Sequence, residues 1–197
     1  MSIRCFIAIE LEEKIKNQLA EQQRLFRKRL SSNESSIKWV KSEQIHLTLK
    51  FLGNVADQDI REICDAVSRA ASEFQPFLFS VGTCGCFPPK GAARVLWIGI
   101  TEGQPELKLL AKRVDHWVNK LGFPLEKRAF SGHLTLARIR QANVGKAVHS
   151  VVDKTSIEIL GQQRVSAITL FQSELRPGGP VYTPMHHAPL TEPYESR

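Results

Sequence analysis

The sequence has no long apolar run and no leader-like beginning. None of its apolar stretches approaches the roughly 20 residues that a membrane-spanning helix needs. Residues 1–6 read as the start of a strand and lack the basic, apolar and small-residue regions of a signal peptide. We therefore expect a soluble, cytoplasmic protein with no membrane partner.

Cysteines are too few for a disulfide framework and are wrongly spaced for a zinc site. The four of them, Cys5, Cys64, Cys84 and Cys86, fit reduced thiols in a cytosolic protein. The single-residue gap between Cys84 and Cys86 is shorter than the usual spacing of zinc ligands, and no second cluster follows to complete a set. The sequence predicts no metal and no cofactor.

The composition favours a folded protein with an anionic partner. A chain of 197 residues with 42% hydrophobic content can form one fairly large domain or two small lobes. The net charge of +7, with a pI near 9.4, supports a polyanionic partner such as nucleic acid without identifying it.

The tetrapeptide His-Leu-Thr-Leu occurs twice, at residues 46–49 and at residues 133–136. With average residue usage, such a repeat arises by accident roughly a few times in a thousand chains of this length. Alternation along a strand puts His46 and Thr48 on one face and the leucines on the other, and the second copy repeats this arrangement. Two proton-transferring groups, each beside a neutral hydroxyl, suggest a site with a paired acid and base.

The remaining pattern predicts that both halves run strand, helix, histidine strand, helix, strand. The first half has expected strands at 3–9 and 77–86, helices at 11–30 and 57–71, and a motif strand that residues 37–40 lead into. The second half, after a turn at 88–91, has expected strands at 95–100, 130–139, 165–171 and 181–187 and helices at 105–121 and 146–152. We predict one domain, 1–197, with two lobes from residues 1–92 and 93–197 and room for exchange of terminal strands. The fold class is α+β: two mainly antiparallel sheets around a central cleft, helices outside, and a pseudo-two-fold axis.

The motifs and their flanks resemble those of the two-histidine (2H) phosphoesterases. More narrowly, the chain is similar to bacterial RNA 2′,3′-cyclic phosphodiesterases, first named 2′-5′ RNA ligases. The likeness extends over nearly the full length and includes these segments: Trp39-Val40, Phe51-Leu52-Gly53, residues 130–138, Ser173-Glu174-Leu175 and residues 178–182. Gly132 departs from the family, which usually has proline there; the change frees the backbone and removes no catalytic group.

The resemblance implies metal-independent hydrolysis of a 2′,3′-cyclic phosphate at an RNA end, giving a 2′-phosphate. It assigns His46 as proton donor and His133 as proton acceptor, with Thr48 and Thr135 holding the non-bridging oxygens. Because the two motifs are identical, the sequence alone does not distinguish donor from acceptor.

The resemblance also places substrate-binding residues five positions after each histidine. These are Phe51, as a base-stacking aromatic, and Arg138, as a phosphate-binding cation. Strict strand alternation points both side chains away from the histidine face, so a bulge or a strong twist is needed to redirect them.

The sequence is compatible with other functions. The same site could carry 2′-5′ RNA ligation, in which a 5′-hydroxyl replaces water, or could act on small cyclic nucleotides or on tRNA-derived ends. A non-catalytic RNA-binding module is a further alternative, although binding alone needs no paired acid and base. The expected partner is an RNA with a 2′,3′-cyclic phosphate end, tRNA-derived RNA among the candidates, and the protein is expected to be a monomer.

Overall fold

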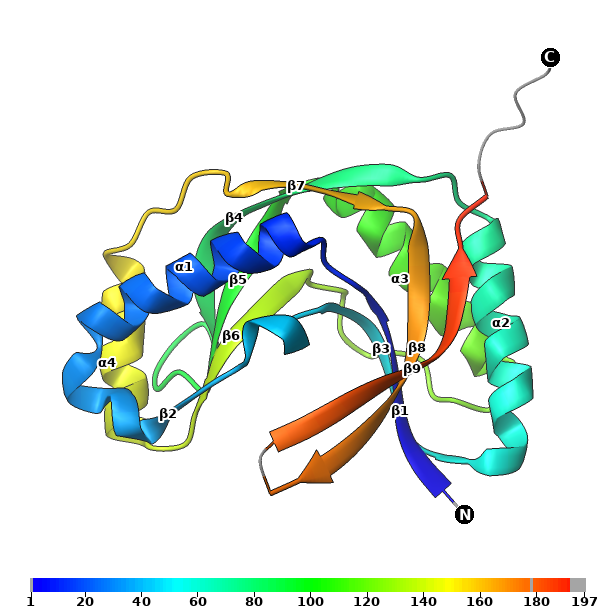
Figure 1. The fold of residues 1–197 in the computed structure, drawn as a ribbon, viewed down its shortest axis with the longest axis horizontal. Helices are drawn as coiled ribbons and strands as arrows, with labels where there is room; N and C mark the ends of the chain where they lie inside the picture. Colours follow the sequence, from blue (N-terminus) through cyan, green and yellow to red (C-terminus); the bar gives the residue numbers. More distant parts are fainter. Residues whose placement is uncertain (1, 178, 192–197) are drawn as a thin grey trace.

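Two sheets form the centre of the molecule (Figure 1). This computed structural model describes residues 2–177 and 179–191. A four-stranded sheet has the order β3-β1-β8-β9 and is built from β3 (Leu47–Ala56), β1 (Ser2–Ile9), β8 (Ala167–Arg176) and β9 (Gly179–Pro189). A five-stranded sheet has the order β2-β6-β5-β4-β7 and is built from β2 (Ile37–Trp39), β6 (His133–Ile139), β5 (Val95–Glu102), β4 (Phe77–Phe87) and β7 (Gly161–Val165).

Four helices cover the outer faces of the sheets. They are α1 (Glu13–Arg29), α2 (Ile60–Ser72), α3 (Gln104–Asn119) and α4 (Ala142–Asp153). Helices α2 and α3 pack on the four-stranded sheet, and α1 and α4 pack on the five-stranded sheet (Figure 1). All pairings of neighbouring strands in the described residues are antiparallel, so the predicted α+β fold with two antiparallel sheets and outer helices is confirmed.

The two sheets repeat one arrangement. The order β3-β1-β8-β9 matches β6-β5-β4-β7. In each sheet the strand of a histidine motif, β3 or β6, lies beside the first strand of its own half, β1 or β5. Terminal strands of each half cross over, however: β4, the last strand of the first half, joins the sheet of β5 and β6, while β8 and β9, the last two strands of the second half, join the sheet of β1 and β3. Each sheet is therefore built from both halves of the chain.

Helix α3 shows how the sequence determines this packing. Gly103 precedes it with φ 74°, and an added Cβ there would lie 2.4 Å from the carbonyl oxygen of Leu78, so only glycine fits. Pro105 then occupies the first turn, where no backbone N–H is missed. The buried stripe recurs at helical spacing and consists of Leu107, Leu110, Ala111, Val114 and Val118.

Two sequence-based predictions need correction. Residues 37–40 do not lead into the first motif strand, because β2 pairs with β6 in the other sheet and a 3₁₀ turn, η2 (Ser42–Gln44), separates it from β3. Strand β7 was missed because its sequence, Gly-Gln-Gln-Arg-Val, is polar; it is an edge strand that pairs only with β4. None of the helices in the described ranges is long and apolar enough to cross a membrane.

Candidate active site

His46 and His133 are held in the same way. The Nδ1 atom of His46 lies 2.8 Å from the carbonyl oxygen of Gln44, and Nδ1 of His133 lies 2.8 Å from the carbonyl oxygen of Ser131. A carbonyl can only accept, so Nδ1 carries the proton when either ring is neutral. In both copies this leaves Nε2 as the nitrogen that can exchange a proton with a ligand.

The neighbouring side chains alternate as the motif predicts. Leu47 and Leu134 are fully buried under the helices, whereas Thr48 and Thr135 are only partly buried, like the two histidines. Within the described ranges neither threonine hydroxyl bonds to another protein group. Both hydroxyls are therefore available to a ligand next to the imidazoles.

Each motif strand contains a β-bulge three residues after its histidine. In β3 the partners are Ala8 with Thr48 and then Ile7 with Lys50, so Leu49 is the extra residue. In β6 the partners of Trp97 and Leu96 are Thr135 and Ala137, so Leu136 is the extra residue. An extra residue reverses the alternation beyond it.

The bulges redirect the side chains five positions after each histidine. Phe51 is 58% exposed, and its ring centroid lies 6.0 Å from that of Phe6, which itself stacks on His46 at 4.7 Å. Arg138 is exposed and close enough for its charge to act on His46. The structure thus brings Phe51 and Arg138 to the side of the sheets that carries the histidines, as the resemblance requires.

A buried glutamine supports the bulge in β6. The Nε2 atom of Gln23, on α1, donates to the carbonyl oxygen of Leu136 at 2.9 Å and to that of Val40 at 2.7 Å. The backbone N–H of Val40 also donates to the oxygen of Leu136 at 2.9 Å. The sequence did not indicate this role, because one glutamine in a polar helix carries no signal.

We expect Gln23→Leu to destabilise the protein by about 1–3 kcal/mol, because the partly buried carbonyl of Val40 loses its donor and the buried carbonyl of Leu136 loses one of its two donors. The measurement is the midpoint of guanidinium-induced unfolding. Gln18→Leu, at an exposed position of the same helix, is the matched control and should leave the midpoint nearly unchanged. Equal midpoints for the two variants would contradict a structural role for Gln23.

Aromatic rings surround both histidines. Tyr182, on β9, meets His46 edge-on at 5.2 Å, and Phe87, on β4, meets His133 edge-on at 5.0 Å. Burial raises the pKa of Tyr182, while the nearby charges of Arg138 and Arg4 oppose this shift. Tyr182 belongs to a segment that the resemblance had singled out, residues 178–182, of which Gly178 lies outside the described residues.

The charges of the second motif act on His46. Burial lowers the pKa of His46, the carbonyl of Gln44 opposes this, and the charges of Arg138 and His133 lower it further. The two motifs, 87 positions apart in the sequence, therefore share one electrostatic environment.

We expect Arg138→Ala to raise the pKa of His46, because a positive charge that disfavours the imidazolium is removed. The protonated fraction of His46 near its ordinary pKa should increase, and NMR titration of the ring protons would measure it. Arg138→Lys keeps the charge and should leave the pKa closer to that of the wild type. A pKa that falls, or stays constant in Arg138→Ala, would show that the arginine does not act on His46.

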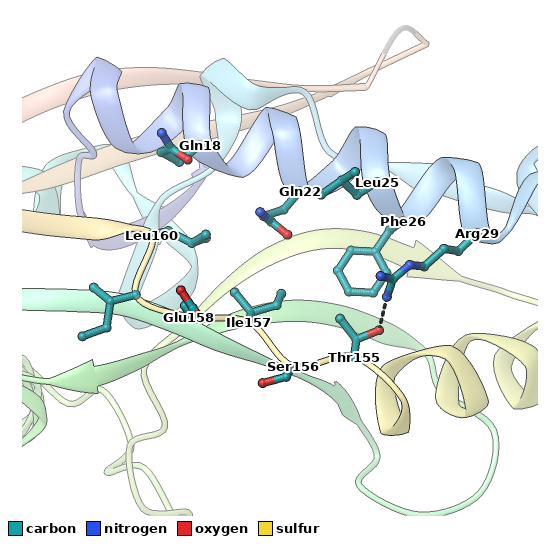
Figure 2. A pocket seen from close by; sticks show the side chains of 11 residues that line it. Gln18, Gln22, Leu25, Phe26, Arg29, Thr155, Ser156, Ile157, Glu158 and Leu160 are labelled. Atoms are coloured by element: carbon teal, nitrogen blue, oxygen red, sulfur yellow. Dashed lines mark hydrogen bonds between the residues drawn. The ribbon is translucent and has the colours of Figure 1, made fainter.

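The surface has two hollows near the helices and strands described above. One, of about 330 Å³, adjoins His46 and is bordered by β1, β8, β9 and η2. Figure 2 shows the other, of about 340 Å³, between α1 and residues 155–160, where the Arg29 guanidinium donates to the hydroxyl of Thr155 at 2.6 Å. The second hollow contains no residue of either motif.

The family assignment follows from the duplicated geometry and from sequence comparison. The family described as LigT like Phosphoesterase matches this chain twice, at residues 9–97 and at residues 98–182. The chain belongs to this family. The LigT-like match falls once on each half and includes one histidine motif each time, as the repeat predicts.

Two relatives are similar over nearly their whole length. A protein of Archaeoglobus fulgidus named RNA 2′,3′-cyclic phosphodiesterase is 37% identical over 180 residues, which cover 91% of this chain and 96% of the relative. A protein of Methanothermobacter thermautotrophicus with the same name is 33% identical over 186 residues, covering 94% and 97%. Both organisms are archaea, so the resemblance to bacterial enzymes was drawn too narrowly.

A solved structure shows the same fold. The crystal structure of TT0787 of Thermus thermophilus superposes with a TM-score of 0.78 at 26% identity, covering 98% of this chain and all of the other. The predicted two-lobed, duplicated architecture is thus also found in an experimental structure.

Proposed function

We propose that this protein hydrolyses 2′,3′-cyclic phosphate ends of RNA to 2′-phosphomonoesters by metal-independent acid–base catalysis. The observation that carries the proposal is the pair of equivalent imidazoles, each fixed through Nδ1 to a backbone carbonyl and each free at Nε2. The names of the two relatives supply the substrate class.

The two imidazoles can serve opposite sides of one phosphorus atom. In-line displacement places the attacking water and the departing 3′-oxygen roughly opposite each other, so two proton carriers on two walls are needed. We assign His133 as the acceptor that takes the proton of water, and His46 as the donor that protonates the leaving oxygen. This assignment follows the resemblance of the motifs to those of the family.

The low pKa of His46 is compatible with a donor role once substrate is bound. In the free protein, burial and the positive charges nearby favour neutral imidazole. A phosphodiester anion between the two histidines adds an opposite charge, which favours the imidazolium and raises the pKa. Substrate binding would therefore favour the protonated form of His46, the proton donor.

The other four residues of the proposed site bind the substrate. The hydroxyls of Thr48 and Thr135 would donate to the non-bridging oxygens, on which charge develops. The guanidinium of Arg138 would pair with the same phosphate, and the exposed ring of Phe51 would stack on the terminal base. All six residues belong to one chain, so a single copy can supply every proposed role.

The decisive experiment incubates the pure protein, with EDTA present, with an oligoribonucleotide ending in 2′,3′-cyclic phosphate. We expect conversion to a 2′-phosphate end, identified by chromatography against 2′- and 3′-phosphate standards. Binding of the oligonucleotide without turnover would indicate an RNA-binding module instead. Turnover that disappears with EDTA and returns with a divalent metal would contradict the metal-independent mechanism.

A further inference from the structure

The hollow of about 330 Å³ beside His46 has no role in the mechanism above. It lies at the beginning of β3, and His46 forms part of its wall. The hollow is also lined by residues that include Phe6, Glu10, Glu43, Phe171 and Tyr182. Its size is at the small end for ligand pockets, which suits a single ring system better than a long chain.

The walls of this hollow are aromatic. Phe6 and Phe171 stack with ring centroids 5.2 Å apart at 15°, and Tyr182 meets Phe6 edge-on at 5.0 Å. These side chains belong to a separate apolar cluster on the face of the sheet away from α2. Phe6 and Phe171 are 3% and 7% exposed, so they form the floor of the hollow, and the partly exposed ring of Tyr182 offers a flat ligand such as a nucleobase a surface for stacking.

Two carboxylates determine what kind of ligand fits. Glu10 and Glu43 line the hollow, and Glu10 accepts a hydrogen bond from the hydroxyl of Thr169 at 2.8 Å. Lys16 also lines the hollow, but its ammonium pairs with Oε2 of Glu13 at 3.6 Å. The carboxylates therefore leave an excess of negative charge there, which is unfavourable for a phosphate. They accept hydrogen bonds from amino groups of nucleobases, as they do from cytosine N4 in protein–DNA interfaces.

The hollow is separate from the proposed site of the terminal base. Phe51 does not line it; that ring lies opposite Phe6 in the strand register, five residues beyond His46. The exposed ring of Phe51 and the hollow are therefore two distinct places near His46, and the ring of Phe6 contacts both Phe51 and His46.

We propose that this hollow binds a second nucleobase, that of the nucleotide preceding the one with the cyclic phosphate. The proposal rests on the proposed function. Because the carboxylates accept hydrogen bonds, the hollow favours adenine over uracil, whose pairing edge has two carbonyl oxygens that face carboxylates unfavourably. A second nucleobase could also come from the 5′ end of an acceptor strand in ligation, and the experiment separates the two sources.

The experiment compares kcat/KM for three substrates: adenosine 2′,3′-cyclic phosphate, and the dinucleotides ApA and UpA ending in a 2′,3′-cyclic phosphate. Stacking of one more base predicts that ApA exceeds the mononucleotide by about tenfold, with UpA in between. Hydrolysis of the mononucleotide tests the proposed function by itself. If it is hydrolysed and neither dinucleotide is better, the base of the preceding nucleotide does not bind in the hollow, while the proposed function stands.

Two variants locate the effect in the hollow. Tyr182→Ala removes one wall and should reduce the ApA advantage to less than about twofold; the ratio within the variant cancels any general loss from the contact with His46. Glu43→Gln can donate as well as accept, so the ratio of ApA to UpA should approach one. Leu175→Ala, 75% exposed near the turn of the same hairpin and outside the hollow, is the control and should keep both ratios. Unchanged ratios in Tyr182→Ala and Glu43→Gln would overturn the proposal.

A final arm adds an unphosphorylated ApA acceptor to a cyclic-phosphate oligonucleotide. Competitive inhibition of hydrolysis, or a 2′-5′-linked product, that is lost in Tyr182→Ala would place an acceptor base in the hollow. If inhibition or ligation is seen but there is no dinucleotide advantage, the hollow binds a second nucleobase that comes from the acceptor strand. If neither effect is seen and there is no dinucleotide advantage, base binding in the hollow is excluded.

Discussion

Replacing either His46 or His133 with alanine should lower kcat on a cyclic-phosphate RNA end by roughly 10²- to 10⁴-fold, the usual contribution of a positioned acid or base. The double variant should be only slightly slower than the slower single variant, because the two groups act in one concerted proton transfer. Substrate binding should change much less than kcat, since Thr48, Thr135 and Arg138 remain. Single-turnover kinetics with a radiolabelled oligonucleotide would measure both quantities.

His116→Ala is the matched control for the histidine variants. This histidine is exposed on the outer helix α3, outside both motifs, and its ring contacts that of Trp117, so activity should be unchanged. Circular dichroism should show that all the variants are folded. Turnover retained in either active-site variant would rule out the two-histidine mechanism.

Lys50→Met should destabilise the protein by about 3–5 kcal/mol, because it leaves a partly buried carboxylate without its cation. The Lys50 side chain is 3% exposed, and its ammonium lies 2.6 Å from Oδ1 of Asp115 and 2.7 Å from the carbonyl oxygen of Pro124. It also lies 3.4 Å from Oε1 of Glu126. Urea unfolding monitored by fluorescence would give the change in free energy.

A double-mutant cycle separates the lost charge pair from lost packing. Adding Asp115→Asn to Lys50→Met removes the unpaired charge and should recover part of the stability, while the amide oxygen can still accept from the N–H of Glu126. Arg24→Ala breaks an exposed ion pair with Glu21 and should leave the unfolding midpoint unchanged. No coupling between Lys50 and Asp115 would show that the lysine stabilises β3 only through its aliphatic stem.

The repeat made much of the fold and of the site predictable. Alternation within His-Leu-Thr-Leu correctly placed the leucines under the helices and left the histidines and threonines on the other face. The buried stripe of α3 followed from helical spacing. These features are local, and the period of a strand or a helix is enough to define them.

Features that depend on partners distant in the sequence were not predictable. Position 51 and position 138 lie on the histidine face only because of bulges at Leu49 and Leu136, and a bulge depends on the neighbouring strand and on supports such as Gln23. The hydrophobic pattern of β2 likewise does not tell which sheet it joins. The aromatic neighbours of His46 come from β1, β8 and β9, which pairing alone brings together.

The crossing of β4 and β8 into opposite sheets ties the two lobes together mechanically. Separating the two halves of the chain would break backbone hydrogen bonds in both sheets, because β4 of the first half pairs with β5 and β8 of the second half pairs with β1. The two imidazoles belong to different sheets, so their separation depends on how the sheets pack and on the chain segments that cross between them. We expect the two halves of the chain to unfold in one cooperative transition.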